Sequence, residues 1–347
     1  MSKGELLEAE DAGRSVRTAG WTRLPRKTKT RWLIPRGPRR ATASALGIYQ
    51  PVTLKGLLGW EVARLMASCG LFRLFPEGGG APTEVQEAIA PHVPPGGTLA
   101  VSFSNPPGRY VVFLMDAGGT VRAVAKVGTT PIMKATLARE AATLRSLPAH
   151  LPPPLEAPRM LDHREGLLLL ELVSWDARID PWMLPEEVAG AMGAFLRSGR
   201  SSPEDPTGWC HGDFAPWNLF KSARGWVVLD WEHAQPGGRA FFDMFHYVVM
   251  AHALLGKPSR QAILSGISGK GWFGRALSAY ARAADLPLEN IEDHFVRYVV
   301  ESAAHLDRNT RDGRRGMAAR SRLLSDLGHP VSALDRGDAD TARPKSG

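Results

Sequence analysis

The chain has 347 residues, of which 44% are hydrophobic and 22% are charged, and its formal net charge is +8. These proportions exclude a disordered or fibrous chain, and the length exceeds what a single core usually fills, which favours two lobes or domains. Its two cysteines, Cys69 and Cys210, form no C-x-x-C pair, so neither a disulfide framework nor a cysteine zinc site is indicated. Because no leader-like segment and no apolar run of membrane-spanning length occurs, we expect a cytoplasmic protein.

Basic residues crowd the first 45 positions, together with Pro25, Pro35 and Pro38. This composition is typical of a basic arm rather than a packed domain, although Trp21 and Trp32 are candidates for attaching it to the body. The positive charge leaves an anionic partner open, such as a nucleotide or, through peripheral contact, an acidic membrane surface. We expect no nucleic-acid partner, because the basic residues lack interleaved aromatic residues at a known module spacing. The oligomeric state is not determined by the sequence.

Residues 55–75 have the pattern of an amphipathic helix. The residues at helical spacing on its apolar face are Leu58, Val62, Leu65, Met66 and Cys69. We predict that this face packs against the core, and a helix lying on a membrane is the alternative. The segment PEGGGAP (residues 76–82) then breaks the chain. We assign residues 1–95 to an N-terminal extension that contains the basic arm, residues 1–45, and this helix.

Residues 98–104, 110–117 and 120–127 show the pattern of three antiparallel strands joined by tight Gly and Pro turns. Residues 129–147 have a helical pattern, and residues 160–173 predict two further strands around the turn HREG. This order predicts a small α+β lobe with an antiparallel sheet, residues 96–173. Residues 174–329 carry apolar residues every three or four positions, which predicts a larger, mainly helical lobe. The polar tail, residues 330–347, is predicted to be disordered.

Two motifs of the second lobe contain three oxygen-bearing side chains. CHGDFAPWNLF (residues 210–220) holds Asp213 and Asn218, and VVLDWEHA (residues 227–234) holds Asp230 after an apolar strand. Phosphoryl transfer requires metal ions on the phosphates and a carboxylate that orients the acceptor hydroxyl. Asn218 and Asp230 offer the oxygen ligands that Mg²⁺ prefers beside substrate phosphates. In the first lobe Lys126 ends a strand and Glu140 follows in the helix, and a lysine held by a glutamate suits a phosphate group.

HGDFAPWN followed by VVLDWE resembles the catalytic loop and metal-binding strand of the aminoglycoside phosphotransferase and choline kinase family, relatives of the protein kinases. His211, Asp213 and Asn218 match the pattern H-x-D-x-x-x-x-N, and Asp230 matches the aspartate that follows it. The resemblance extends more weakly over about residues 95–325. It implies a bilobal protein-kinase-like fold and an ATP- and Mg²⁺-dependent kinase that phosphorylates a hydroxyl of a small molecule, such as a sugar, an amino alcohol or a related metabolite.

Carried over by residue, the resemblance implies Asp213 as the catalytic base and Asn218 and Asp230 as Mg²⁺ ligands. It implies Lys126 on the α- and β-phosphates with Glu140 as its ion-pair partner. The remaining assignments place Glu171 and Val173 at the hinge that meets the adenine, and give His211 and Asp243 the role of bracing the catalytic loop.

Some residues depart from the kinase pattern or stand outside it. The loop SFSNPPGR has only Gly108 in place of G-x-G-x-x-G, so the candidates to contact the phosphates there are Ser102, Ser104 and Arg109. Gly212 stands where protein kinases usually carry the arginine that reads activation-loop phosphorylation, which favours a small-molecule kinase. Glu232 either reaches a second metal ion or caps the strand. His246, His252 and His305 lack ligand spacing and are predicted to be ordinary surface or core histidines.

The acceptor is the least determined part of the function. Residues 239–327 contain 13 Lys or Arg against 9 Asp or Glu, which argues against a polycationic acceptor and leaves a sugar or another neutral or anionic alcohol. The alternative function is a catalytically weak or inactive kinase-fold scaffold in a surface-polysaccharide pathway. Such a protein would dock on a partner or membrane through the basic arm and the helix at residues 55–75.

Overall fold

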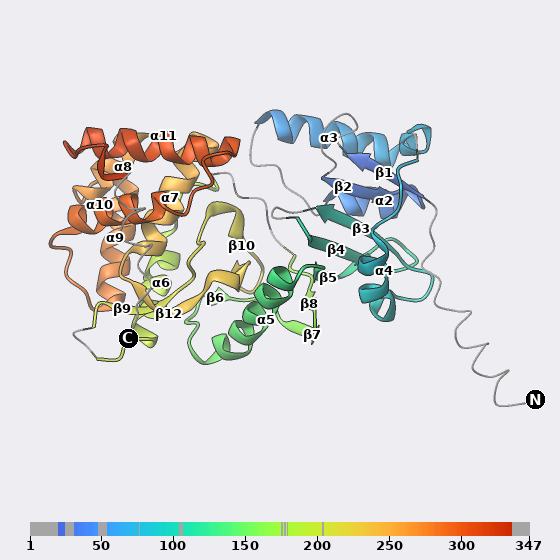
Figure 1. Cartoon of the computed structure of the whole chain (residues 1–347), viewed down its shortest axis with the longest axis horizontal. Coiled ribbons are helices and arrows are strands. Elements are labelled where there is room, and N and C mark those ends of the chain that lie inside the picture. Colours follow the sequence, from blue (N-terminus) through green and yellow to red (C-terminus); the bar gives the residue numbers. More distant parts are fainter. Residues whose placement is uncertain are drawn as a thin grey trace, which may run out of the picture. The chain divides into compact units, whose positions relative to one another are not determined.

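The computed structural model describes residues 20–24, 31–47, 54–75, 77–103, 107–174, 176, 178, 180–202 and 205–334. Residues 1–19 of the predicted arm and 335–347 of the predicted tail lie outside the described residues. The chain forms two compact units (Figure 1). The sheet unit comprises residues 1–145 and 158–173, and the helical unit comprises residues 146–157 and 174–347. No helix among the described residues is both long and apolar enough to cross a membrane.

The sheet unit contains a seven-stranded antiparallel sheet with the order β1-β2-β3-β4-β5-β8-β7. Its strands are β1 (Trp21–Leu24), β2 (Trp32–Pro35), β3 (Thr98–Phe103), β4 (Arg109–Met115), β5 (Val121–Gly128), β7 (Met160–Arg164) and β8 (Leu167–Glu171). Strands β3, β4, β5, β7 and β8 coincide with the five strands expected from alternating apolar residues. The prediction of a small antiparallel-sheet lobe joined to a mainly helical lobe in an α+β fold is confirmed.

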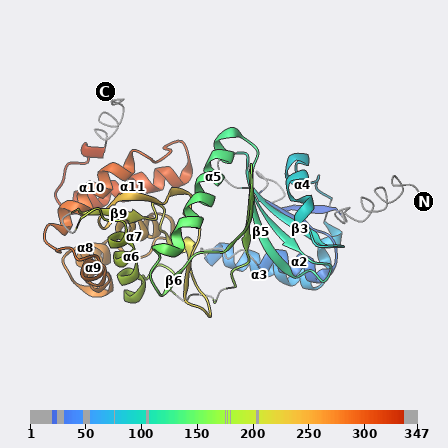
Figure 2. The ribbon, with the colours of Figure 1, turned by 90° about the horizontal axis from the view of Figure 1, so that it is seen from below.

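Helices cover both faces of this sheet (Figure 2). On one face, Val85 and Ile89 of α4 (Thr83–Ile89) pack with buried residues such as Leu99. On the other face, α2 (Arg39–Gly47) and α3 (Leu54–Ser68) enclose a second core that includes Ala100 and Phe113. Because successive strand residues point to opposite faces, neighbours such as Leu99 and Ala100 enter different cores.

The interpretation of residues 1–45 as an unpacked basic arm is wrong for the described part of that segment. Strands β1 and β2 belong to the sheet, and Trp21 and Trp32 are buried with exposed fractions of 5% and 8%. The indole N–H of Trp21 donates a hydrogen bond to the carbonyl oxygen of Leu99 at 3.3 Å. Basic residues such as Arg23 and Arg31 are exposed. Composition averaged over the segment therefore concealed two short apolar strands between charged positions.

Helix α3 packs on the sheet through a different face from the one expected. Leu58, Val62 and Leu65 are exposed, with exposed fractions of 69%, 57% and 65%, and Cys69 is also exposed. The residues that face the core are Trp60, Ala63, Met66 and Ala67. The prediction that the first face packs against the core is thus correct for Met66 and wrong for the four exposed residues. Helical spacing identifies which residues share a face, but this helix has two apolar faces, and small residues such as Ala63 and Ala67 allow the closer approach.

The helical unit contains most of the helices among the described residues. These are α6 (Glu186–Ser198), α7 (Phe242–Leu255), α8 (Arg260–Ile267), α9 (Gly271–Ala284), α10 (Ile291–Ala303) and α11 (Arg311–Asp326). Two small sheets accompany them: β6 (Leu155–Glu156), β10 (Leu219–Lys221) and β11 (Trp226–Val228) form one, and β9 (Thr207–Cys210) pairs with β12 (Gln235–Arg239). Strands β9 and β10 flank HGDFAPWN, and VVLDWE begins in β11 and is followed by β12. Backbone hydrogen bonds between paired strands therefore fix the ends of both motifs.

The packing of α6 on α9 provides a test of the helical unit. A Cβ atom at Gly193 of α6 would come within 2.2 Å of the Tyr280 carbonyl oxygen, whereas one at Gly190 would lie 3.8 Å from the nearest atom outside its own helix, the Ala279 carbonyl oxygen. We expect Gly193→Ala to lower the free energy of unfolding by about 1–3 kcal/mol because α9 must move away. Gly190→Ala should raise it by about 0.5–1 kcal/mol through helix propensity. Urea unfolding monitored by circular dichroism measures both, and equal effects would contradict this packing.

Candidate active site

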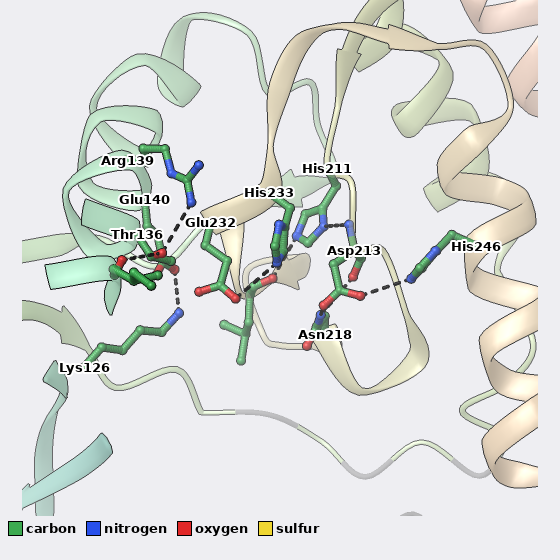
Figure 3. Close-up of polar contacts among 12 residues, drawn as sticks. Lys126, Thr136, Arg139, Glu140, His211, Asp213, Asn218, Glu232, His233 and His246 are labelled. Atoms are coloured by element: carbon green, nitrogen blue, oxygen red, sulfur yellow. Dashed lines mark hydrogen bonds and ion pairs between the residues drawn. The ribbon is translucent and has the colours of Figure 1, made fainter. Parts of the chain in front are cut away.

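Lys126 and Glu140 form a buried ion pair in the sheet unit (Figure 3). The Lys126 Nζ atom lies 2.5 Å from Glu140 Oε1, and the two side chains are 7% and 1% exposed. Strand β5 directs Ala125 and Val127 into one core, so Lys126 points to the opposite face. There it meets Glu140 of α5 (Pro131–Ser146). Buried charges of this kind are stable only when paired, so each side chain holds the other in place.

The other predicted nucleotide-binding residues occupy less constrained positions. Glu171 ends β8, where its carboxylate accepts a hydrogen bond from the Arg159 backbone N–H at 3.1 Å, and Val173 follows it as a buried residue. Ser104 lies outside the described residues. Arg109 begins β4 and pairs across the sheet with Gly128.

Asp243 of α7 anchors the loop HGDFAPWN in the helical unit. Its two carboxylate oxygens accept hydrogen bonds from the backbone N–H groups of His211, at 2.8 Å, and Gly212, at 3.0 Å. Burial raises the pKa of Asp243, although His211 and the two backbone N–H groups act in the opposite direction. Gly212 has a φ of 79°, and a Cβ atom there would lie 2.6 Å from the His233 carbonyl oxygen. The backbone geometry at this position therefore requires glycine.

His211 connects this loop to the segment before Asp230. Its Nε2 atom lies 2.9 Å from the Leu229 carbonyl oxygen, and its Nδ1 atom accepts the Asp213 backbone N–H at 3.2 Å. Because Nδ1 is an acceptor and Nε2 faces a carbonyl oxygen, the ring hydrogen lies on Nε2. Complete burial lowers the pKa of His211 and outweighs the nearby carboxylates. His211 is thus a neutral brace of the loop.

The side chains of His246 and Asn218 hold the carboxylate of Asp213 in the helical unit (Figure 3). Its Oδ1 atom lies 3.1 Å from His246 Nε2, its Oδ2 atom accepts the Asn218 amide hydrogen at 3.3 Å, and its side chain is 35% exposed. Desolvation raises the pKa of Asp213, but the hydrogen bond from His246 and the electrostatic interactions with the imidazoles of His246 and His211 outweigh it, so the pKa lies below its usual value. The carboxylate is therefore ionised, oriented and accessible from solvent.

Asn218 and Asp230 provide a donor set that fits Mg²⁺. The Asn218 Nδ2 atom donates to the Asp213 backbone carbonyl oxygen at 2.9 Å as well as to the Asp213 carboxylate, so the amide oxygen is the atom that remains to face a cation. Asp230 follows β11 with a φ of 61°, and its charge raises the pKa of Asp213. One amide and one carboxylate oxygen suit an ion that also takes phosphate and water ligands. Among the described residues, no three His, Cys, Asp or Glu side chains form a metal cluster.

His246 is the site residue that the sequence interpretation missed. It was predicted to be an ordinary surface or core histidine, but its ring contacts the carboxylate of Asp213. His246 follows Asp243 by three residues on α7, and residues at this spacing share one face of a helix. The sequence therefore contained a signal for His246: its helical spacing from Asp243, a residue expected to brace the catalytic loop. From the sequence, His246 was considered only as a metal ligand. Metal-ligand spacing does not detect a hydrogen bond from a histidine to a carboxylate.

Comparison with known proteins identifies the class of this site. A family model described as "Phosphotransferase enzyme family" matches residues 141–241. This segment contains His211, Asp213, Asn218 and Asp230, so the resemblance inferred from these residues is confirmed there, and it supports a phosphotransferase enzyme. The match begins one residue after Glu140 and ends before His246. No curated protein matches the chain.

Several solved structures are similar to this chain. One is a macrolide 2'-phosphotransferase from Brachybacterium faecium, with 15% identity over 76% of this chain and 99% of that chain and a TM-score of 0.42. Another is a putative fructosamine-3-kinase from Thermobifida fusca, with 17% identity, coverage of 72% and 100%, and a TM-score of 0.44. An amicoumacin kinase in complex with AMP-PNP, Ca²⁺ and Ami has 12% identity, coverage of 67% and 89%, and a TM-score of 0.45.

The neutral state of His211 predicts how stability depends on pH. Below its ordinary pKa of 6.5 the unfolded chain binds a proton at this residue that the folded chain does not bind, so stability present above pH 6.5 is lost as the pH falls. His211→Gln retains an N–H group near Nε2 but does not titrate. Between pH 7 and pH 5 the wild type should therefore lose up to about 2 kcal/mol more unfolding free energy than the variant. Urea titrations at both pH values test this, and parallel losses would contradict it.

Proposed function

We propose that this protein is an ATP-dependent phosphotransferase that phosphorylates a hydroxyl group of a small molecule, with Asp213 as the catalytic base. The observation that carries the proposal is the state of Asp213: its carboxylate is held by His246 and Asn218 while remaining 35% exposed. Its lowered pKa keeps it ionised and able to accept a proton. A general base must reach the proton that it removes and must be deprotonated beforehand.

The proposed reaction uses this carboxylate together with Asn218 and Asp230. The acceptor hydroxyl transfers its proton to Asp213 as its oxygen forms a bond to the γ-phosphorus of ATP. The bond from that phosphorus to the oxygen bridging the β- and γ-phosphates breaks, and ADP leaves. The Asn218 amide oxygen and the Asp230 carboxylate would hold Mg²⁺, which when bound neutralises charge on the phosphates. His211 and Asp243 keep the loop in place through the backbone contacts described above.

In the sheet unit we propose that Lys126 contacts the α- and β-phosphates. The support is its burial and its fixed position beside Glu140, because a lysine orients phosphate well only when its own flexibility is restricted. We further propose that backbone groups near Glu171 and Val173 meet the adenine, and that Ser104 contacts the phosphates. The last assignment rests on the sequence pattern alone.

The proposed acceptor is a sugar, an amino alcohol or a related metabolite. The groups next to Asp213 are the imidazole of His246 and, around that ring, the aromatic side chains of Phe242 and Tyr298. The excess of basic residues in residues 239–327 is unfavourable for a polycation and leaves a neutral or anionic alcohol.

Turnover tests the proposal directly. Purified protein with Mg²⁺ and ATP, assayed for ADP formation against a panel of sugars, amino alcohols and related metabolites, should phosphorylate at least one of them. Asp213→Asn should lower kcat by about 10²–10⁴-fold, because general base catalysis is lost, while nucleotide binding is retained. Nucleotide binding by the wild type without turnover on any acceptor would instead support the scaffold function.

Nucleotide binding tests the role of Lys126 separately. Lys126→Met should weaken ATP binding by roughly tenfold to a hundredfold, because a charged contact to phosphate is lost. Lys134→Met is the matched control, since Lys134 is a solvent-accessible lysine of the same unit that pairs with exposed Glu165 at 2.9 Å. Calorimetry measures both affinities. Equal ATP affinity of the two variants would exclude Lys126 from the nucleotide site.

A further inference from the structure

A row of hydrogen-bonded side chains extends from Asp213 into the core of the helical unit. His246 of α7 contacts Asp213 at 3.1 Å, the Tyr298 hydroxyl of α10 lies 3.3 Å from His246 Nδ1, and Arg320 Nη2 of α11 lies 3.2 Å from the Tyr298 hydroxyl. Tyr298 and Arg320 are buried, with exposed fractions of 3% and 1%. We name Arg320, Tyr298 and His246 the histidine row. Three helices distant in sequence are needed to assemble it.

The buried guanidinium sets the direction of the hydrogen bonds in this row. Arginine has only donors, and Arg320 donates to the Tyr298 hydroxyl, to Ser302 Oγ at 2.9 Å and to the Gly316 carbonyl oxygen at 3.3 Å. The guanidinium also lies over the Tyr298 ring, 5.8 Å from its centroid. Burial raises the pKa of Tyr298, so the hydroxyl keeps its hydrogen. Because its oxygen accepts from Arg320, that hydrogen is available for His246 Nδ1.

The hydrogen position on His246 follows from this direction. When the Tyr298 hydroxyl donates to Nδ1, 3.3 Å away, a neutral ring carries its hydrogen on Nε2, which faces Asp213 Oδ1. The Phe242 ring stacks on the imidazole with centroids 5.8 Å apart and an interplanar angle of 16°. The Tyr298 ring meets its edge at 6.2 Å and 86°. Aromatic contact on the face and at the edge restricts rotation of the imidazole.

We propose that His246 is a positioning residue for the base Asp213, with Arg320 and Tyr298 holding its imidazole in the Nε2–H tautomer so that this N–H fixes carboxylate oxygen Oδ1. This inference rests on the proposed function of Asp213. His246 keeps its proton throughout the reaction, and the proton of the acceptor hydroxyl moves to Asp213. The N–H group orients the carboxylate towards the hydroxyl. A misplaced base lowers the rate of the chemical step more than it lowers substrate binding.

Replacing His246 with glutamine or with asparagine introduces the same amide group at different distances from Cβ. The side-chain nitrogen of glutamine is separated from Cβ by as many bonds as Nε2 of histidine, whereas that of asparagine is one bond shorter and stands near Nδ1. His246→Asn should therefore lose the contact to Asp213 and lower kcat roughly tenfold to a hundredfold with little change in KM for ATP. His246→Gln should retain roughly tenfold more kcat than His246→Asn.

Controls separate positioning from a general effect on the fold. His252→Asn replaces a histidine of the same helix that contacts the Pro258 carbonyl oxygen at 2.8 Å, and kcat should be unchanged. Tyr298→Phe removes only the hydroxyl and should lower kcat roughly threefold to tenfold. The proposal is overturned if His246→Asn and His246→Gln have equal kcat, or if both variants change KM for ATP rather than kcat.

Nitrogen-15 NMR of histidine-labelled protein tests the tautomer without any turnover. The His246 signal, assigned by its absence in His246→Gln, should show hydrogen on Nε2, and Tyr298→Phe should introduce the Nδ1–H form. A wild-type ring with its hydrogen on Nδ1 would overturn the proposal. If the wild type shows the Nε2–H form but transfers no phosphoryl group to any acceptor, the function of Asp213 is contradicted while the geometry of the histidine row is upheld.

Discussion

The hydrogen bonds of one buried carboxylate, that of Asp243, organise the active-site loop. Removing a carboxylate from water is costly, and the backbone N–H groups of His211 and Gly212 offset that cost. The same contacts connect the loop to the first turn of helix α7. The positions of Asp213 and Asn218 depend on this connection, since both residues follow directly in the loop.

Helix α7 also supplies His246, whose ring contacts the carboxylate of Asp213. Asp243 and His246 lie one helical turn apart, so the helix that anchors the loop backbone also contacts the Asp213 side chain. Helices α10 and α11 then hold His246 through Tyr298 and Arg320. Buried polar groups of this kind are stable only when all of them are hydrogen-bonded. Packing of the three helices and orientation of the Asp213 carboxylate are consequently coupled.

The sheet unit contains the Lys126–Glu140 pair and a sheet extended to seven strands. Strands β1 and β2 add to the edge formed by β3, and α2 and α3 cover the face opposite to α4. Residues that looked like a charged arm therefore take part in the core around β3 and β4. Leu58, Val62 and Leu65 of α3 remain exposed.

The sequence by itself determined many of the local elements and the candidate residues of the proposed active site. Alternation of apolar residues predicted β3, β4 and β5, helical spacing predicted a mainly helical lobe over residues 174–329, and HGDFAPWN with VVLDWE indicated Asp213, Asn218 and Asp230 as candidate site residues. Local patterns suffice for such features because strand and helix periods and a short loop motif are properties of neighbouring residues. Only the tertiary structure decided which face of α3 is buried, that β1 and β2 join the sheet, and that His246 contacts Asp213. These contacts join residues distant in sequence, and their energies depend on burial, which no local pattern specifies.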